Sequence, residues 1–271
     1  MSDGEELSGR RVVLTGVSRR VGIAFTLARD LAAAGADVLT IGWRAHDAEQ
    51  PWGADDDTNT GAALRAGLAG SAGTIVHEEI DLAAAQAPEQ VVDAAVRRFG
   101  GVDALIAAHA LSPAAAVSEF GSLTAEALDR SFAVDTRATL LLIQAFAAAF
   151  DAGAGRRGRV VTFSSGQHRE SMPSELPYIA AKAALQQLTV PLATTLTPLG
   201  IGIICLNPGP VDTGYADDAA RAMVAERHPR GRWGEPADLT GTMRWLLGSG
   251  SDWLTGQTLD VDGGWTARPP R

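Results

Sequence analysis

The sequence predicts an α/β fold, a doubly wound Rossmann-type parallel sheet of about seven strands with helices on both faces. Short β-branched runs alternate with longer helical patterns over nearly the whole chain. Such alternation is typical of parallel sheets whose crossovers are helices. No linker, repeat or low-complexity stretch interrupts residues 7–265. We therefore expect residues 1–271 to form a single domain.

Each expected element follows from its local pattern. Strands are expected at residues 11–15, 37–41, 74–80, 102–108, 159–164, 201–206 and 257–261. Helices are expected at residues 23–34, 61–72, 88–99, 123–150, 176–196 and 236–247, with a break inside the fourth as an open alternative. Residues 42–60 read as an excursion loop, and residues 212–233 as a pocket lid. Ligands bind such sheets beyond the carboxyl ends of the strands, so we expect the site there.

Composition excludes several classes of protein. The chain has 271 residues, 46% of them hydrophobic, and its net charge of −9 argues against nucleic-acid and anionic-membrane partners. Cys205 is the only cysteine, which excludes an intrachain disulfide and fits a reducing compartment. No secretory leader is expected from the acidic N-terminus, and the longest apolar run, 138–150, is too short to span a bilayer. A cytoplasmic protein that binds a small molecule is expected.

The stretch from residue 160 to 185 carries the chemistry. Ser165 follows an apolar strand, and Tyr178 and Lys182 lie four residues apart on the next helix, which places them on one face. An ammonium beside a phenol stabilises the phenolate and lowers a pKa that is normally about 10. The pair thus indicates that Tyr178 is a general acid/base. Taken alone, the motif more often marks only a surface tyrosine and lysine.

A glycine loop, TGVSRRVGIA, follows the first strand at residues 15–24. Gly16 and Gly22 allow the backbone to approach a ligand, and the helix that starts near Gly22 directs amide groups at a pyrophosphate. Arg19 and Arg20 add phosphate donors. The alternative is a tight turn with two solvated arginines. The position of the loop in a doubly wound sheet favours dinucleotide binding.

With these motifs together, the chain resembles the short-chain dehydrogenase/reductase family. The residues that carry the resemblance are Thr15, Gly16, Gly22, Asp81, Ser165, Tyr178, Lys182, Asn207, Pro208 and Gly209. It extends over residues 11–264. The glycine loop is similar to a longer variant in enoyl-acyl-carrier reductases. The spacing of tyrosine and lysine is that of the carbonyl-reducing members, such as the 3-oxoacyl-acyl-carrier-protein reductases.

The resemblance implies roles for particular residues. Tyr178 would exchange a proton with the substrate oxygen, Ser165 would bind the carbonyl, and Lys182 would tune Tyr178 and hold the nicotinamide ribose, with Asp135 as the fourth catalytic residue. The implied cofactor-binding residues are Gly16, Ser18, Arg19, Arg20, Gly22, Ile23, Arg44, Asp81, Leu82, Ala108, Tyr178, Lys182, Pro208, Gly209, Val211 and Thr213. The resemblance also implies a homotetramer or homodimer formed through helices 123–150 and 176–196.

The cofactor can be argued from the end of the second strand. In the family an acid there selects NAD(H) by gripping the ribose hydroxyl. Here the place is taken by Gly42, Trp43 and Arg44, and Arg44 together with the loop arginines suits a 2′-phosphate. NADP(H) is therefore favoured. NAD(H) stays open as the alternative, because Asp47 follows closely.

Two departures from the family pattern stand out. Ala107 and Ala108 occupy the place of an Asn-Asn pair, and Asp135 occupies the place of a catalytic asparagine. A carboxylate accepts hydrogen bonds but does not donate an amide N–H. It would also pair with Lys182 and alter the pKa of Tyr178. The alternative is a conservative exchange that leaves turnover intact.

Loops at the expected rim supply the substrate pocket. The candidates are His109, Gln167, His168, Met172 and Tyr215. His109 would orient substrate, assist proton transfer or only shape the wall. The other histidines lack metal-ligand spacing, so no metal site is expected.

The function expected is that of an NADP-dependent oxidoreductase that interconverts a ketone and a secondary alcohol on a small-molecule or acyl substrate. One alternative is altered chemistry on the same fold, such as imine reduction or a non-redox rearrangement. Another is a nucleotide-binding protein with a dead site.

Overall fold

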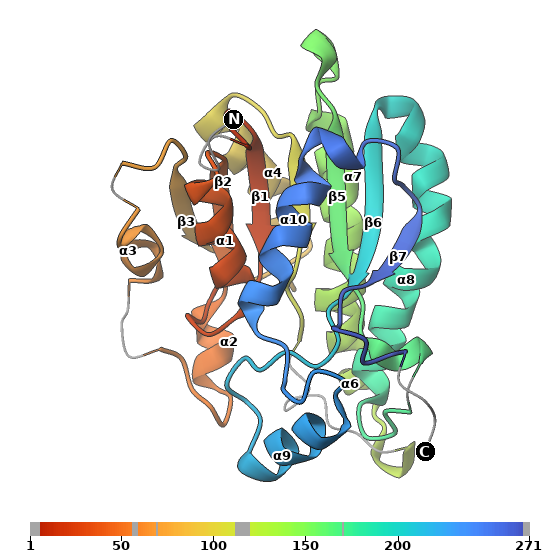
Figure 1. The fold of residues 1–271 in the computed structure, drawn as a ribbon. Helices are drawn as coiled ribbons and strands as arrows, with labels where there is room; N and C mark the ends of the chain where they lie inside the picture. Colours follow the sequence, from red (N-terminus) through yellow and green to blue (C-terminus); the bar gives the residue numbers. More distant parts are fainter. Residues whose placement is uncertain (1–5, 56–58, 69, 112–119, 170, 268–271) are drawn as a thin grey trace.

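A seven-stranded sheet forms the centre of the protein in a computed structural model that describes residues 6–55, 59–68, 70–111, 120–169 and 171–267. The strands are β1 (Arg11–Thr15), β2 (Asp37–Gly42), β3 (Ile75–Glu79), β4 (Ala104–Ala107), β5 (Gly158–Phe163), β6 (Ile201–Asn207) and β7 (Gln257–Asp260). They pair in parallel in the order β3-β2-β1-β4-β5-β6-β7 (Figure 1). The predicted fold class is confirmed. The order reverses between β1 and β4, and this switch point is where ligands bind in such sheets.

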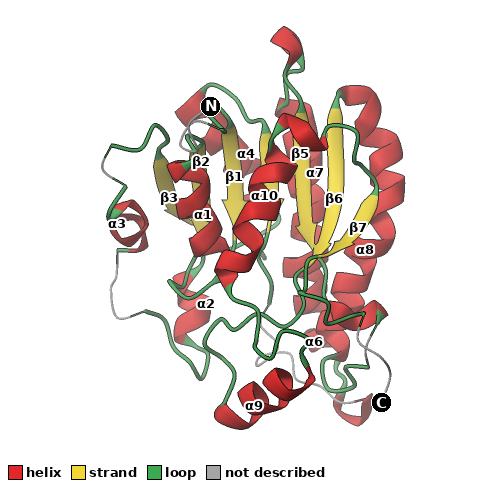
Figure 2. Cartoon of the chain, viewed as in Figure 1, coloured by secondary structure: helices red, strands yellow, loops and turns green. Residues whose placement is uncertain are grey.

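Helices cover both faces of the sheet (Figure 2). On one face lie α1 (Ile23–Ala33), α3 (Thr60–Arg65) and α10 (Thr240–Leu247), and on the other α4 (Ala87–Phe99), α7 (Thr139–Ala149) and α8 (Leu176–Leu196). Three further helices, α2 (Arg44–Ala48), α6 (Ala125–Ser131) and α9 (Asp218–Arg227), lie beyond the carboxyl ends of the strands, at the bottom of the view in Figure 1.

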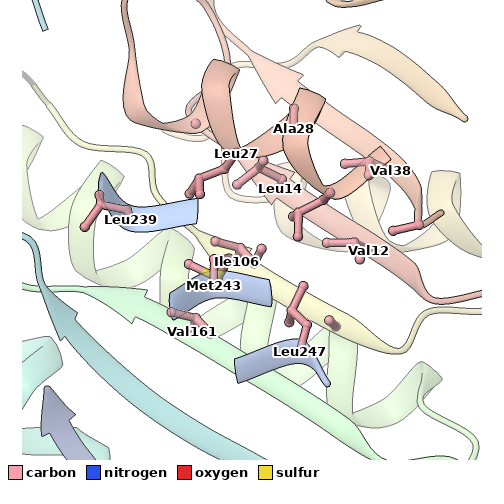
Figure 3. Close-up of a cluster of buried hydrophobic side chains, with 14 of the residues drawn as sticks. Val12, Leu14, Leu27, Ala28, Val38, Ile106, Val161, Leu239, Met243 and Leu247 are labelled. Carbon is pink, nitrogen blue, oxygen red and sulfur yellow. The ribbon is translucent and has the colours of Figure 1, made fainter. Parts of the chain in front are cut away.

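Each face of the sheet has its own hydrophobic core. Leu14 and Ile106 pack with Leu27 of α1 and Met243 of α10, all fully buried (Figure 3). On the opposite face, a second cluster joins the neighbouring strand residues to α4 and α7. Successive strand residues point to opposite faces, so strands buried on both sides need the continuous apolar runs seen in the sequence. Burying each leucine contributes about 1.5–3 kcal/mol.

The segment 42–60 departs from the expected excursion loop, because it contains α2. No glycine or proline interrupts residues 43–50, and the first helical N–H, that of Arg44, donates to Glu79 Oε2 at 2.7 Å. The next helix is shorter than expected and ends at Arg65. Gly67 and Gly70 have positive φ angles of 76° and 90°, which a right-handed helix excludes.

The helix expected at 123–150 changes its winding in the middle. Between α6 and α7, residues Phe132–Ala138 form a π-helix, a feature often found at functional sites. By length and composition the run Ala125–Ala149 is long and apolar enough to cross a membrane. The α7 portion of this run packs on α4 and β4. Asp135, in its π-helical portion, is buried. These contacts are those of a core helix.

Candidate active site

The carboxyl ends of the strands enclose a cavity of about 960 Å³. Most of the residues proposed from the sequence line it: Gly16, Ser18, Arg19, Gly22, Ile23, Asp81, Leu82, Ala108, His109, Ser165, Met172, Tyr178, Lys182, Pro208, Gly209, Val211, Thr213 and Tyr215. Arg20, Arg44, Asp135 and Gln167 lie outside the lining. The side chain of His168 is outside the described part of the structure, so its expected place in the pocket is not described.

The glycine loop forms the floor of the cavity between β1 and α1. Gly16 has a φ of 84°, and a Cβ there would lie 2.8 Å from the carbonyl oxygen of Ala108, so only glycine fits. Arg19 donates to the Thr213 carbonyl at 2.9 Å, and its guanidinium lies 5.3 Å from the centre of the Trp52 ring. Arg20 is exposed and lies outside the cavity lining, so its expected role in gripping phosphate stays a prediction.

Beyond β2 the cavity meets the carboxylate of Asp47, the residue that keeps NAD(H) open as the alternative cofactor. Asp47 is buried on α2, and its Oδ2 has no hydrogen-bond partner. His46 Nε2 is likewise buried without a partner, and both residues line the cavity. Arg44 begins α2 between two lining residues, but it is not itself part of the lining. This end of the cavity therefore presents unpaired polar atoms, as a polar ligand requires.

Tyr178 and Lys182 share one face of α8, as predicted, but the expected effect on the Tyr178 pKa is wrong. Lys182 Nζ donates to the carbonyl of His109 at 3.2 Å and lies 5.7 Å from the centre of the Tyr178 ring. Burial raises the pKa of Tyr178, Asp135 and Glu175 raise it further, and hydrogen bonding with Ser165 acts in the opposite direction. Desolvation of the phenolate thus outweighs the attraction expected from the ammonium.

Of the three roles expected for His109, its contacts favour that of a residue that shapes the cavity wall. Its Nδ1 lies 2.6 Å from Thr15 Oγ1, and its Nε2 lies 3.0 Å from the Val134 carbonyl and 3.2 Å from Thr139 Oγ1. These partners assign a neutral ring that donates from Nε2 and accepts at Nδ1. Burial lowers the pKa of His109 to about 3, and the Lys182 charge adds to the effect. Both ring nitrogens are used inside the protein.

Asp135 lies in the π-helix and is fully buried. Its Oδ1 accepts from the Leu111 N–H at 2.7 Å, while Oδ2 has no partner. Burial raises the pKa of Asp135 to about 6, against the opposing effects of Lys182 and the Leu111 hydrogen bond. The carboxyl group is therefore close enough to Lys182 to feel its charge, and it titrates near neutral pH.

The wall beside Ser165 differs in detail from the sequence prediction. Ser165 Oγ donates to Met172 Sδ at 3.8 Å. Gln167 accepts from the Ser165 N–H and donates to Gln186, so it braces the loop outside the cavity instead of contacting a ligand. Tyr215 lies between Trp52 and Trp233, with ring centres 6.5 and 6.2 Å away.

Trp52, Arg130 and Glu175 are among the cavity-lining residues that sequence reasoning missed. Glu175 precedes Tyr178 by three residues, a helical spacing that would have found it. Within the described ranges, no three His, Cys, Asp or Glu residues converge as a metal site would require.

The residues present fit a dinucleotide, since the glycine at position 16 cannot be replaced and polar atoms around the cavity have no partner. A doubly wound sheet with this loop and a Ser-Tyr-Lys set beside it defines a nicotinamide-dependent oxidoreductase.

Comparisons with known proteins agree. A family model described as enoyl-(acyl carrier protein) reductase matches residues 16–266. The uncharacterized oxidoreductase YjdA of Bacillus subtilis (strain 168) is 31% identical over 254 residues, which are 93% of this chain and 95% of that protein. The L-xylulose reductase of Mus musculus is 30% identical and covers 96% of this chain and 98% of its own. A short-chain dehydrogenase of Burkholderia cenocepacia J2315 in complex with NADP superposes with a TM-score of 0.82 at 28% identity, over 96% and 99% of the two chains.

The chain belongs to the short-chain dehydrogenase/reductase family, and it is an NAD(P)-dependent oxidoreductase.

Proposed function

We propose that the protein uses NADP(H) to interconvert a ketone and a secondary alcohol on a small-molecule or acyl substrate, with Tyr178 as the general acid/base. The observation that carries the proposal is the placement of Ser165, Tyr178 and Lys182 on the same cavity as the glycine loop. A proton donor, a carbonyl-binding hydroxyl and a nucleotide cradle are the groups that carbonyl reduction needs.

The chain's own residues position the reactants and move the proton. When bound, a nicotinamide cofactor supplies or accepts the hydride. Gly16, Ser18 and Arg19 would hold its phosphates, with Asp81 near the adenine and Lys182 at the nicotinamide ribose. The Ser165 and Tyr178 hydroxyls would bind the substrate oxygen.

Proton transfer would start at Tyr178. Its phenol is protonated near neutral pH, as proton donation to a carbonyl requires, although the raised pKa makes it a weaker acid. After Tyr178 has donated its proton, Lys182 and Asp135 would supply a proton that restores the phenol. The Asp135 carboxyl group, with a pKa of about 6, both accepts and releases a proton in the working range.

The preference for NADP(H) is supported by Arg19 in the cavity and by Arg44 at its edge, where α2 begins. The NADP complex of the Burkholderia cenocepacia protein shows that a structural neighbour takes this cofactor. The buried carboxylate of Asp47 is the observation that favours NAD(H), because a negative charge repels a 2′-phosphate and accepts a hydrogen bond from a ribose hydroxyl.

For the whole molecule, we propose a single domain of residues 1–271 with a lid at residues 212–233, assembled as a homotetramer or homodimer in the cytoplasm. Val190 of α8 is 62% exposed, and assembly through that helix would cover this apolar side chain. The solution mass measured by light scattering tests it, and a monomer would refute it.

The function is tested by the Tyr178→Phe protein with NADPH and a panel of ketones. Loss of the proton donor should reduce turnover by about 10²–10⁴-fold, whereas NADPH binding should be retained. Tyr215→Phe is the matched control and should keep most of the activity. Unchanged turnover in Tyr178→Phe would refute the assigned role. Wild-type NADPH binding without turnover would favour the dead-site alternative, and product without cofactor oxidation would favour non-redox chemistry.

A further inference from the structure

Glu175 places a carboxylate on the cavity wall one helical turn before Tyr178. It is the N-cap residue of α8, yet its side chain makes no hydrogen bond to the helix backbone. It lines the same cavity as Tyr178, Met172 and Tyr215. As the N-cap it lies just outside the helix, with φ −127° and ψ 34°. Glu175 and Tyr178 therefore face one cavity from neighbouring positions on the chain.

No cation in the described structure compensates this charge. Burial alone raises the pKa of Glu175, and its charge in turn raises the pKa values of Tyr178 and Tyr215. Of the cations that line the cavity, Arg19 and Lys182 donate to backbone carbonyls elsewhere, and Arg130 does not contribute to the pKa shift of Glu175. Glu175 is thus electrostatically coupled to both phenols, and none of the residues that the structure describes pairs with its carboxylate.

A partly buried carboxylate without a partner carries a desolvation cost that a cationic ligand can offset. A ligand hydroxyl would also donate to the carboxylate, but it brings no charge to offset that of Glu175, whereas an ammonium adds a Coulomb attraction to the hydrogen bond. An anionic ligand group would be repelled. The chemistry of this wall therefore favours a positively charged substrate group.

We propose that Glu175 is a specificity residue that selects substrates with an ammonium group about two or three carbon atoms from the reacting carbonyl or alcohol carbon. A short spacing is expected because Glu175 and Tyr178 are three residues apart in sequence and line the same cavity. The inference rests on the proposed function, because it takes Tyr178 as the group that meets the reacting oxygen.

Three alcohols of matched shape test the proposal: 4-amino-2-butanol, 1,3-butanediol and 2-pentanol, which end in an ammonium, a hydroxyl and a methyl group. Their affinities are measured by calorimetry on the enzyme–NADPH complex, in which an alcohol and a reduced cofactor do not react. The amine should bind at least about tenfold more tightly than the other two, as a charge-assisted bond predicts.

Variants separate the charge from the fold. Glu175→Gln should bring the three affinities to within about twofold of one another, and Glu175→Asp should keep part of the amine preference. Glu126→Gln, which changes an exposed acid outside the cavity lining, should leave the preference unchanged. Glu175→Asp also serves if the glutamine variant fails to fold.

Three results would overturn the proposal: equal affinity for the amine and 2-pentanol, a diol that binds as tightly as the amine, or an equal loss for all three alcohols in Glu175→Gln. Failure of the proposed function appears separately, as wild-type enzyme that oxidises no NADPH with 2-pentanone or any other ketone. The binding preference does not depend on turnover, so the two failures are distinguishable.

Discussion

Thr15 Oγ1 lies 2.6 Å from His109 Nδ1 and thereby ties the end of β1 to the segment that follows β4. The opposite ring nitrogen of His109 donates to Val134 in the π-helix, and its backbone carbonyl accepts from Lys182. One residue thus links the sheet, the π-helix and the lysine of the candidate site. We expect changes at His109 to act on stability first and on chemistry only through Lys182.

The first prediction concerns acid stability. The folded-state pKa of His109, about 3, lies below the unfolded value of about 6.5. Its stabilising contribution is therefore complete above pH 6.5 and is lost as the pH falls toward 3, because only the unfolded state takes up the proton. His109→Asn should be less stable than wild type near pH 7, and the difference should shrink by up to about 1.4 kcal/mol per pH unit below 6.5.

Urea unfolding at several pH values between about 7 and 5 measures this difference. Thr15→Val is the control. It removes the hydroxyl partner of Nδ1, costs about 1–3 kcal/mol, and leaves the titrating ring in place. A stability difference that stays constant with pH would show that His109 does not titrate as its burial implies.

Asp135 gives a second prediction of opposite sign. Its folded-state pKa of about 6 exceeds the unfolded value of about 3.9, so its proton binds more tightly in the folded state. The protonated group stabilises the fold at low pH, and this advantage is lost as the pH rises from about 4 to 6. Asp135→Asn should therefore be more stable than wild type by about 1–3 kcal/mol above pH 6 and by nothing near pH 4.

Thermal or urea unfolding at the two pH values checks this difference. An asparagine keeps an oxygen for the Leu111 N–H, whereas Asp135→Ala leaves that donor unpaired and should destabilise the protein at both pH values. If Asp135→Asn is more stable than wild type at low pH as well as at high pH, the gain comes from better packing and not from the lost charge.

A third prediction concerns the pH profile of catalysis. The Asp135 charge contributes to the raised pKa of Tyr178, so its removal in Asp135→Asn should lower that pKa. Alcohol oxidation requires the phenolate. The pH at which kcat/KM for oxidation rises should therefore be lower in the variant than in the wild type, by about half to one pH unit. The pH dependence of kcat/KM with saturating cofactor measures the shift. An unchanged profile would mean that Asp135 is neutral in the working enzyme.

The sequence was sufficient to predict features that depend on periodicity, and it was insufficient to predict features that depend on burial. Alternating strand and helix patterns predicted the sheet and the shared face of Tyr178 and Lys182. They did not reveal α2, because a polar surface helix lacks an apolar stripe. The direction of the Tyr178 pKa was wrong, since desolvation depends on the surrounding walls, and spacing along one helix says nothing about those walls.

Among the cofactor-binding candidates, some features could likewise be predicted from the local sequence and others could not. Gly16 was predictable from its place after β1, because a turn at that point needs a positive φ. The exposure of Arg20 and the burial of Asp47 depend on how the turn and α2 dock on the sheet. Contacts of that kind arise between segments distant in the sequence and leave no local pattern.

The last prediction uses Asp47 to test cofactor choice. Asp47 is a residue of α2, and its buried carboxylate lines the cavity. It should therefore repel a 2′-phosphate with little screening by salt. Asp47→Asn should raise kcat/KM for NADPH by about tenfold and leave that for NADH nearly unchanged, and Arg44→Ala should lower kcat/KM for NADPH. Glu49→Gln is the matched control, because that acid lines the cavity but is exposed and screened by solvent. If Asp47→Asn instead loses NADH activity and leaves NADPH activity unchanged, the carboxylate binds the ribose hydroxyls and the natural cofactor is NAD(H).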